Sequence, residues 1–315
     1  MYFSLFLVPK HTNLSDISSL INLEMKKRKG IILAGGIGSR LSPISLAVSK
    51  QLMPVYDKPM IYYPLTTLML GDINDILLIS SPDHINSFKR LLGDGKSLGI
   101  NIEYATQQKP QGIAQALIIA EQFLNGSPSV LILGDNLFHG NELLPKLESA
   151  NLKKEGATIF AYPVSDPQRY GVVYFNKSGK PYCIEEKPSN PKSRFAITGI
   201  YFYDSTVISK AKKIKPSLRG ELEISSINKL FLQESNLNVE IMGRGMAWLD
   251  TGTFDSLNEA SNYIRALEKR QGLKIGSPEE VAWRKGWIKD SQLKALGNAL
   301  KTSSYGKYLL ELLKN

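Results

Sequence analysis

The sequence contains almost no cysteine and very little histidine. Its 315 residues include one cysteine, Cys183, and three histidines. One cysteine excludes an internal disulfide framework, and His11, His84 and His139 have neither zinc-ligand spacing nor a nucleophile partner. No stretch approaches the roughly 20 apolar residues of a membrane span. We therefore expect a water-soluble globular protein with no membrane partner, and the cytoplasm is the expected compartment.

An excess of acidic residues is also absent, because the charge is unbalanced in the positive direction. The chain has 39 Lys and Arg against 29 Asp and Glu, a formal net charge of +10. The basic residues are scattered apart from a small group at 26–29, and no aromatic-rich basic strand of the RNA-binding type occurs. We therefore expect small phosphorylated anions as partners, and no nucleic acid.

Residues 1–24 differ from the rest of the chain. Residues 3–8 form an apolar run that is too short for a secretory signal core and has no basic residue before it. Met25, followed by two lysines, is a plausible internal start. We expect residues 1–24 to be an N-terminal extension, either disordered or a start-site artefact. A single catalytic domain is expected over 25–255, with a helical C-terminal region over 256–315 packed on it.

From residue 30 onward, short apolar segments alternate with helix-length segments. Two helices are expected, over 60–70, closed by Gly71, and over 113–123. The expected strands around them cover 30–34, 76–79, 102–105 and 129–133. This order is typical of an α/β fold with a mostly parallel central sheet and helices on both faces. Later short strands predict a sheet extension that carries a substrate pocket: 158–164, 171–175, 198–203 and 239–242.

The last part of the chain is predicted to be helical. Ser256 and Glu259 have the spacing of a capping box. Apolar residues then recur on one helical face, at Leu257, Ala260, Ile264 and Leu267. Lysine-rich helices follow, which predicts a helical appendage to the catalytic domain.

A glycine-rich turn follows the first expected strand, with Gly35, Gly36, Gly38 and then Arg40. Glycines let backbone N–H groups approach an anion, and Arg40 supplies a cation beside them. The turn is neither a Walker A loop nor the G-x-G-x-x-G pattern. By spacing alone, a phosphate site and a plain tight turn are equally supported. Lys50, ten residues after Arg40, is either a second phosphate contact or a solvated surface charge.

Two aspartates follow apolar strands. Asp135 comes after the run at 129–133, and Asp250 follows Trp248 and Leu249. Ligands of open α/β sheets gather at the carboxyl ends of strands, and two carboxylates are a usual protein contribution to a Mg²⁺ site. The alternative is that each aspartate caps a turn. Charged segments at 185–188 and 216–221 supply groups for sugar hydroxyls and a sugar phosphate, or are charged loops.

Eight motifs in this order resemble the glucose-1-phosphate thymidylyltransferases, sugar-nucleotide pyrophosphorylases that open dTDP-rhamnose synthesis. The resemblance covers residues 29–288. Its motifs are Leu33-Ala34-Gly35-Gly36, Ser49-Lys50-Gln51, Tyr56-Asp57-Lys58-Pro59-Met60-Ile61-Tyr62-Tyr63-Pro64, Gly134-Asp135-Asn136, Arg169-Tyr170-Gly171-Val172, Glu185-Glu186-Lys187-Pro188, Arg219-Gly220-Glu221-Leu222-Glu223-Ile224 and Trp248-Leu249-Asp250-Thr251-Gly252-Thr253.

The resemblance implies a Rossmann-like nucleotidyltransferase fold, a homotetramer, and Mg²⁺ held between Asp135 and Asp250. It implies that a deoxythymidylyl group passes from dTTP to α-D-glucose 1-phosphate, giving dTDP-glucose and pyrophosphate by in-line attack on the α-phosphorus. UTP or another hexose 1-phosphate is the alternative substrate. Members of the family often carry a second, allosteric nucleotide site.

The resemblance also implies roles for single residues. Arg40, Lys50 and Lys187 are expected to be catalytic, and Gln107 and the Gly112 turn are expected to meet the thymine. The residues expected at the nucleotide are Leu33, Gly35, Gly36, Gly38, Ser39, Arg40, Lys50, Gln51, Gln107 and Gly112. The residues expected at the sugar phosphate are Asn136, Tyr170, Gly171, Glu186, Lys187, Ile197 and Arg219.

The chain departs from the family pattern at a few positions. Ser39 and Ser42 stand where the family usually has threonine and tyrosine, and Ser226 stands where it has aspartate. Gln108 and Lys109 replace a more usual Pro-x pair beside the base-binding turn. Ser39 keeps a hydroxyl group, so a phosphate contact is expected to survive there. The departures leave the choice between dTTP and UTP open.

Overall fold

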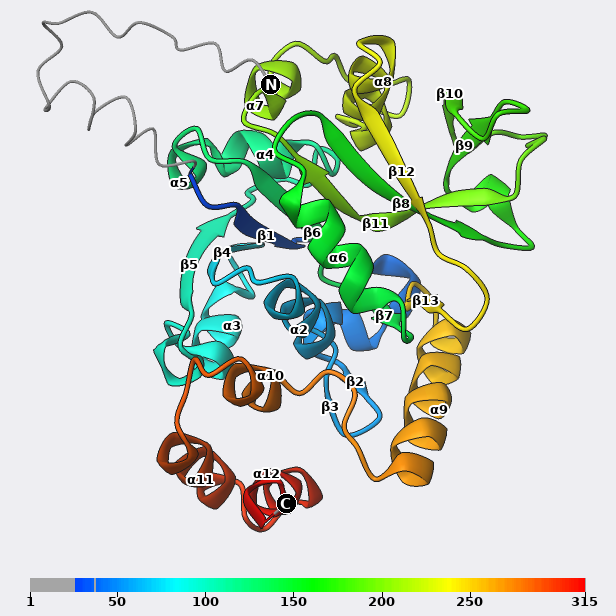
Figure 1. The fold of residues 1–315 in the computed structure, drawn as a ribbon. Coiled ribbons are helices and arrows are strands. Elements are labelled where there is room, and N and C mark those ends of the chain that lie inside the picture. The colour runs from blue at the N-terminus through cyan, green and yellow to red at the C-terminus, as the bar shows by residue number, and fades with distance from the viewer. Residues whose placement is uncertain (1–25, 37, 315) are drawn as a thin grey trace, which may run out of the picture.

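The computed structural model describes residues 26–36 and 38–314. The expected N-terminal extension at 1–24 lies outside these residues. Within the described part of the chain, nine strands form one large sheet and two strand pairs lie apart from it (Figure 1). In the same part of the chain, no helix has the length and apolar character needed to cross a membrane.

The first half of the large sheet is entirely parallel. Its strands pair in the order β6-β1-β4-β5. They are β1 (Lys29–Ala34), β4 (Asp75–Ser80), β5 (Asn101–Thr106) and β6 (Ser129–Leu133). Side chains of β1, β4 and β6 are almost all buried, as expected for strands covered on both faces. These four strands match the predicted ones within one residue.

The central strand of the second half of the sheet is β11 (Phe195–Tyr203), which pairs antiparallel with β6 and with β8 (Ala157–Pro163). Beyond β8, β12 (Leu237–Ile241) pairs in parallel. On the other side of β11, β9 (Gly171–Phe175) and β10 (Pro181–Glu186) form an antiparallel hairpin. The predicted sheet extension is therefore present, and the mixed α/β fold class is confirmed.

Helices cover both faces of the sheet, because neighbouring residues of a strand point to opposite sides. Ile32 of β1 packs in the same apolar cluster as α2, α3 and α6, whereas Ile31 packs with α4, α5, α7 and α8. The bounds of these helices are α2 (Tyr62–Leu70), α3 (Ile85–Leu92), α4 (Gln115–Ile119), α5 (Glu121–Leu124), α6 (Leu143–Leu152), α7 (Val207–Ala211) and α8 (Ile224–Gln233). The short 3-10 helices are η1 (Ser39–Leu41), η2 (Ile44–Leu46), η3 (Lys50–Leu52), η4 (Lys96–Leu98), η5 (Pro167–Arg169) and η6 (Leu312–Lys314).

Two helix predictions need correction in detail. The helix expected at 60–70 is α2, which begins at Tyr62; Gly71 is its C-cap as predicted, but with an ordinary negative φ, and Asp72 is the residue in the left-handed conformation. The helix expected at 113–123 is divided into α4 and α5 at Ala120, which is the C-cap of one and the N-cap of the other. Apolar periodicity marks a helical segment but does not show where its hydrogen-bond ladder is interrupted.

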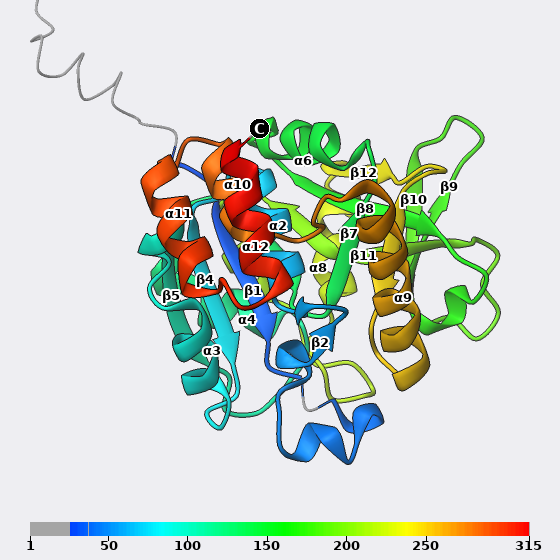
Figure 2. The ribbon, with the colours of Figure 1, turned by 90° about the horizontal axis from the view of Figure 1, so that it is seen from below.

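Of the four C-terminal helices, the last three pack on the α2 side of the sheet (Figure 2), and the first packs in a separate apolar cluster with Val55, Met60 and Leu137. The four helices are α9 (Phe254–Gln271), α10 (Pro278–Arg284), α11 (Asp290–Ala299) and α12 (Ser304–Glu311). The predicted capping box between Ser256 and Glu259 is wrong. Thr253 is the N-cap of α9, its side chain accepts from the Ser256 N–H, and the Ser256 hydroxyl accepts from the Thr253 N–H. Serine supplies the reciprocal acceptor that the box usually takes from glutamate, three residues after the cap.

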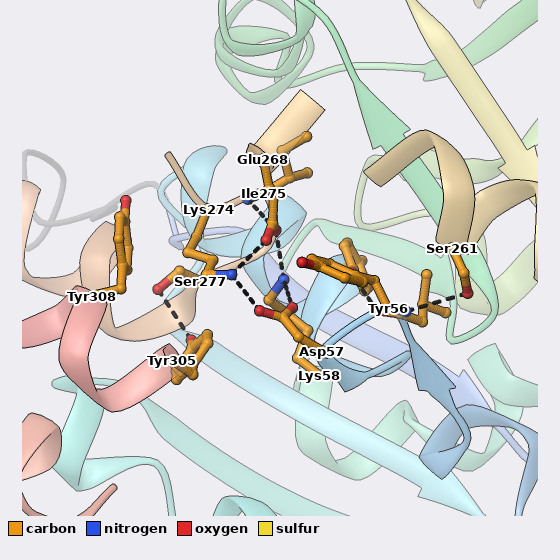
Figure 3. A network of polar contacts seen from close by, with 12 residues as sticks. Tyr56, Asp57, Lys58, Ser261, Glu268, Lys274, Ile275, Ser277, Tyr305 and Tyr308 are labelled. Carbon is orange, nitrogen blue, oxygen red and sulfur yellow. Dashed lines mark hydrogen bonds and ion pairs between the residues drawn. The ribbon is translucent and has the colours of Figure 1, made fainter. Parts of the chain in front are cut away.

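A small hairpin, formed by β2 (Pro54–Val55) and β3 (Lys58–Pro59), is held by four charged side chains (Figure 3). Lys58 Nζ lies 2.6 Å from Asp57 Oδ1 and 2.7 Å from Glu268 Oε1. Lys274 Nζ pairs with Asp57 and, at 2.6 Å, with Glu268 Oε2. We call Asp57, Lys58, Glu268 and Lys274 the buried ion network. It ties the hairpin to the end of α9 and to the segment that follows.

Candidate active site

Asp135 and Asp250 lie together just after the end of β6, where the chain passes from the large sheet into a small one. After β6 the chain passes through Gly134 and Asp135 into β7 (Asn136–His139), which pairs antiparallel with β13 (Ala247–Asp250). The register places Asp250 opposite Asn136, and the Thr251 hydroxyl donates to the backbone carbonyl of Asp135 at 2.9 Å. The structure thus brings Asp135 and Asp250 together at the carboxyl end of a central strand, where ligands of such sheets gather.

A pocket of about 250 Å³ lies over this aspartate pair. All of the residues that the sequence predicts for the sugar phosphate line it: Asn136, Tyr170, Gly171, Glu186, Lys187, Ile197 and Arg219. Arg40, Asp135 and Asp250 line it as well. Lys50 reaches the same place from η3, because its Nζ donates to Asp135 Oδ2 at 2.5 Å. Four cations from separate segments, Arg40, Lys50, Lys187 and Arg219, therefore line this pocket or reach its aspartates.

The other residues predicted for the nucleotide lie beside this pocket rather than in its lining. Leu33 is the second-last residue of β1, and its carbonyl accepts from the Gly134 N–H at 2.9 Å. Gln51, in η3, packs close to Gly134. Gln107 follows β5, where its N–H donates to the Ser80 carbonyl. Leu33 and Gln107 thus lie at the carboxyl ends of parallel strands, the same edge of the sheet at which Asp135 follows β6.

The glycines of the predicted turn serve different purposes. At Gly35 a Cβ atom would lie 2.3 Å from Gln107 Oε1, so the turn and Gln107 pack directly on each other. Gly38 has a φ of 64°, in the left-handed region that favours glycine. Around Gly36 a Cβ would meet no atom within 4 Å, which leaves that side of the turn open to a ligand.

Gly112 precedes Ile113, which lines the pocket, but Gly112 itself is not in the lining. It has a φ of 105°, and a Cβ there would lie 2.5 Å from the backbone oxygen of Leu222. Its neighbour Gln111 accepts from the Leu222 N–H at 2.7 Å. The lack of a side chain at Gly112 is therefore explained by packing against the segment before α8. The structure gives no contact that assigns it to a base.

The two aspartates have opposite electrostatic surroundings. Burial opposes ionisation of Asp135, but the charge of Lys50 and the hydrogen bonds from Lys50 and Asn136 together outweigh it and lower the pKa of the Asp135 carboxyl. Burial, and then the negative charge of Asp135, raise the pKa of Asp250. The nearest cation of Asp250 is Arg169, whose Nη2 lies 3.5 Å from Asp250 Oδ2. The charges of Lys50, Arg169 and Arg40 act in the opposite direction but do not outweigh burial and the repulsion from Asp135.

Glu186 adds a hydrogen-bonding carboxyl group to the pocket lining. Burial raises the pKa of Glu186, which also has the negative charge of Glu223 near it. Lys187 has a φ of 44°, an uncommon backbone conformation for a residue other than glycine, and its N–H donates to the Tyr170 carbonyl. Such local strain is typical of functional sites, where the surrounding structure holds it. The pocket thus combines a hydrogen-bonding carboxyl group with the nearby cations Lys187 and Arg219.

Several lining residues were not assigned from the sequence. Arg169 and Trp248 stand inside recognised motifs without a stated role, and Trp248 Nε1 donates to Asn136 Oδ1 at 2.5 Å. Tyr201, Glu223, Ser225 and Asn228 also line the pocket. Tyr201 comes from β11, and the other three come from the N-cap and the first turns of α8, a helix that was not predicted. Glu223 stands inside a recognised motif without a stated role, and no local signal marks the other three as pocket residues.

Comparisons with known proteins agree with this geometry. The model of the nucleotidyl transferase family matches residues 29–266. The glucose-1-phosphate thymidylyltransferase of Neisseria meningitidis is 54% identical over 286 residues, covering 91% of this chain and 99% of that protein. The enzyme of the same name from Mycobacterium tuberculosis matches with the same identity and coverage.

Solved structures share the fold. A crystal structure described as a glucose-1-phosphate thymidylyltransferase of Bacillus anthracis, in complex with sucrose, has a TM-score of 0.71 and 44% identity. It covers 76% of this chain, and this chain covers 95% of it. A UDP-glucose pyrophosphorylase complexed with UDP-glucose has a TM-score of 0.66 at 20% identity, over 78% of this chain and 100% of its own, which shows likeness of fold alone.

Proposed function

This chain belongs to the nucleotidyl transferase family, and within it to the glucose-1-phosphate thymidylyltransferases, and on that premise we propose that it makes dTDP-glucose. The substrates are dTTP and α-D-glucose 1-phosphate, and the second product is pyrophosphate. One observation carries the assignment to this pocket. Every residue expected at the sugar phosphate lines the same pocket as Asp135 and Asp250.

The proposed roles follow from charge. The phosphate of glucose 1-phosphate and the triphosphate of dTTP are both anions, so cations must offset their repulsion as they approach. Arg40 and Lys50 are proposed to hold the triphosphate beside the open face of the turn at Gly36. Lys187 and Arg219 are proposed to hold the sugar phosphate, and both line the pocket.

We propose that Asp135 and Asp250 hold Mg²⁺. The donor set fits, because two carboxylates converge on one pocket and Asp250 is only partly compensated by the cations near it. When bound, the cation would offset charge on the phosphates and make the α-phosphorus more electrophilic.

The chemical step needs no protein nucleophile. An oxygen of the sugar phosphate attacks the α-phosphorus in line, and the bond from that phosphorus to the oxygen of the leaving pyrophosphate breaks. The protein's contribution is to fix both substrates in reactive geometry, which supplies a large share of the catalysis. Glu186, half-buried in the pocket lining, is proposed to accept hydrogen bonds from glucose hydroxyls.

Other features are proposed from the family resemblance. They are a homotetramer, a cytoplasmic location, an allosteric nucleotide site, and a place at the start of dTDP-rhamnose or a related deoxysugar route for surface polysaccharide. The division into a catalytic domain over 25–255 and a helical region over 256–315 is supported by the packing of α10 to α12 on the α2 face. Light scattering of the purified protein tests the tetramer.

The substrate assignment is tested by pyrophosphate release from the purified protein with Mg²⁺. Four nucleoside triphosphates are combined with several sugar 1-phosphates. We expect the pair of dTTP and glucose 1-phosphate to give the highest kcat/KM. A higher value with UTP or with another hexose 1-phosphate would replace the proposed substrates, since base and sugar choice depend on a few hydrogen bonds.

The metal assignment is tested by Asp135→Ala and Asp250→Ala in the same assay. Each change removes one of the two carboxylates, so we expect pyrophosphate release to be abolished. Near-normal turnover in both variants would refute the metal site. The control is Asp83→Ala, which removes an exposed aspartate in a turn outside the pocket lining and should retain turnover.

A further inference from the structure

Arg169 stands between two carboxylates at the mouth of the pocket. It ends η5, and its Nη1 lies 2.8 Å from Asp166 Oδ2 while its Nη2 lies 3.5 Å from Asp250 Oδ2. Its guanidinium also lies over the Tyr170 ring, 5.2 Å from the ring centroid. It lines both the active-site pocket and a second pocket that adjoins it on the outer side. Arg169 therefore pairs both with Asp166 and with Asp250 of the aspartate pair.

The contact of Arg169 with Asp250 differs from that of Lys50 with Asp135. The Lys50 side chain is 7% exposed and its ammonium is 2.5 Å from its carboxylate. The Arg169 side chain is 39% exposed, and its Nη2 lies 3.5 Å from Asp250 Oδ2, which is 1.0 Å longer than the contact of Lys50 with Asp135. Within the described residues, Arg169 is the only ion-pair partner of Asp250. Asp250 is thus paired weakly, with a cation that has a closer partner elsewhere.

We propose that Arg169 is a replaceable counter-ion of Asp250, and that Asp166 sets how firmly it is held there. While no divalent cation is bound, Arg169 partly balances the aspartate pair. When a divalent cation takes Asp250, Arg169 gives up that contact and stays on Asp166. The inference rests on the proposed function and deepens it, because the Asp166–Arg169 pair then tunes the affinity of the site for its cation. Arg169 acts as a positioning residue.

The second partner makes this exchange inexpensive. Removing one member of a buried ion pair leaves an uncompensated charge, which strongly disfavours release of a cation such as Lys50. Arg169 keeps Asp166, whose side chain is 37% exposed, and its planar guanidinium offers separate N–H groups to the two carboxylates. One contact can therefore be lost while the other holds.

The test is calorimetric titration of the full-length protein with Mn²⁺ or Mg²⁺, without substrates. Arg169→Met should tighten binding about threefold to tenfold, the size expected for loss of one half-exposed ion pair. Arg169→Lys should restore most of the wild-type affinity, because it returns the charge. The matched control is Arg194→Met. Arg194 lines the same outer pocket, and no ion pair of it occurs within the described residues, so its removal should leave affinity within about twofold.

Asp166→Asn should weaken cation binding, because Arg169 then has Asp250 as its remaining charged partner. A general loss of negative charge would weaken binding too, so the double variant Asp166→Asn/Arg169→Met separates the two causes. Under the proposal, the effect of Asp166→Asn disappears once Arg169 is gone. If it persists unchanged, or if Arg169→Met shifts affinity no more than Arg194→Met, the inference is wrong. A wild-type protein that binds no divalent cation overturns the metal assignment itself, and the inference with it.

Discussion

Two clusters of opposite charges lie in this protein, and they differ in how completely they are paired. In the buried ion network, the carboxylates of Asp57 and Glu268 are each bonded to both Lys58 and Lys274. At the active site, Asp135 has Lys50 at 2.5 Å, but Asp250 has only the distant, shared Arg169 among the described residues. Complete pairing marks the structural cluster, and incomplete pairing marks the one that has room for a ligand.

The pKa shifts follow the same division. Burial opposes ionisation of Asp57, but hydrogen bonds from Lys274 and Lys58 outweigh it and lower the pKa of its carboxyl. For Asp250, burial and the charge of Asp135 act in the same direction and raise the pKa. A buried carboxylate with a raised pKa opposes folding at neutral pH, which is a cost that functional sites often carry.

The closed cluster also supports the open one. The hairpin that the buried ion network holds is bonded to η3, because the N–H groups of Met60 and Ile61 donate to the carbonyls of Met53 and Gln51. Next to Gln51 stands Lys50. On the other side, the Thr251 hydroxyl contacts Met60 Sδ and the Asp135 carbonyl. Both halves of the aspartate site thus rest on the hairpin.

The largest effect on stability is expected from Lys58→Met. It leaves Glu268 and Asp57 with one cation between them, in a place where the Lys58 and Glu268 side chains are 1% and 3% exposed. Breaking such a buried pair costs about 3–5 kcal/mol. The free energy of unfolding, from urea titration, should fall by that amount.

The control for Lys58→Met is Lys58→Met/Glu268→Gln, which restores charge balance and keeps an acceptor for the Ile275 N–H. We expect the double variant to regain at least about half of the loss, because no uncompensated charge remains. A loss below about 1 kcal/mol in the single variant would show that the pairing does not carry the hairpin.

Asp135→Asn and Asp250→Asn should have opposite effects on the metal-free fold. Asp135→Asn leaves the Lys50 ammonium, on a side chain that is 7% exposed, without its charged partner, at a cost of about 1–3 kcal/mol. Asp250→Asn removes a buried charge that Asp135 repels, so its melting temperature should rise by about 1–3 °C. Thermal unfolding in the presence of a chelator measures both. Shifts of the same sign would contradict the difference in pairing.

The pH dependence should separate the two clusters. Glu186, in the pocket, has a raised pKa, so its ionised form is costly in the fold and it takes up a proton early as the pH falls. Asp57 has a lowered pKa, so its stabilisation is present above the unfolded pKa and is lost only as the pH falls through the lower, folded one. On acidification, the KM for glucose 1-phosphate should therefore rise before stability falls.

The reference for the pH experiment is Glu186→Gln. The substrate phosphate also titrates, with a second pKa of about 6, and that contribution is present in both proteins. The acid-side rise in KM that is seen with the wild type and missing with Glu186→Gln belongs to the glutamate. Identical pH profiles of KM in the two proteins would exclude Glu186 from sugar binding. The free energy of unfolding of the two proteins should differ only by a small constant amount near neutral pH.

How far the sequence predicts this structure depends on the kind of signal. The strands β1, β4 and β6 match their predicted ranges within one residue, because buried parallel strands are continuous apolar runs bounded by turn residues. The edge strand β5 also matches within one residue, although its side chains are mostly not buried. The meeting of Asp135 and Asp250 depends on the pairing of β7 with β13, segments far apart in the chain. Nothing local encodes that pairing, so the aspartates were found as candidates and their convergence needed the structure.

The same limit explains Arg169. The residue was visible in a motif with Tyr170 and Gly171, but its two carboxylate partners come from η5's own N-cap and from the end of β13. Its importance lies in the difference between two distances, which a sequence pattern does not contain. The capping box of α9 failed for the opposite reason: a valid local pattern at Ser256 and Glu259 overlapped the true one at Thr253 and Ser256.

The smallest effect is expected from Ser39→Thr, at a residue that belongs to neither cluster. Ser39 is exposed at the start of η1, its backbone carbonyl accepts from the Ser42 N–H, and no hydrogen bond of its hydroxyl occurs within the described residues. Ser39→Thr keeps the hydroxyl and adds a methyl group toward solvent, so kcat and KM for dTTP should change by less than about twofold. Ser39→Ala removes the group proposed to meet phosphate and should lower kcat/KM about tenfold, the size of one hydrogen bond to a charged group. If alanine and threonine behave alike, phosphate binding at this turn belongs to the backbone and Arg40, and the departure from the family residue at position 39 is neutral.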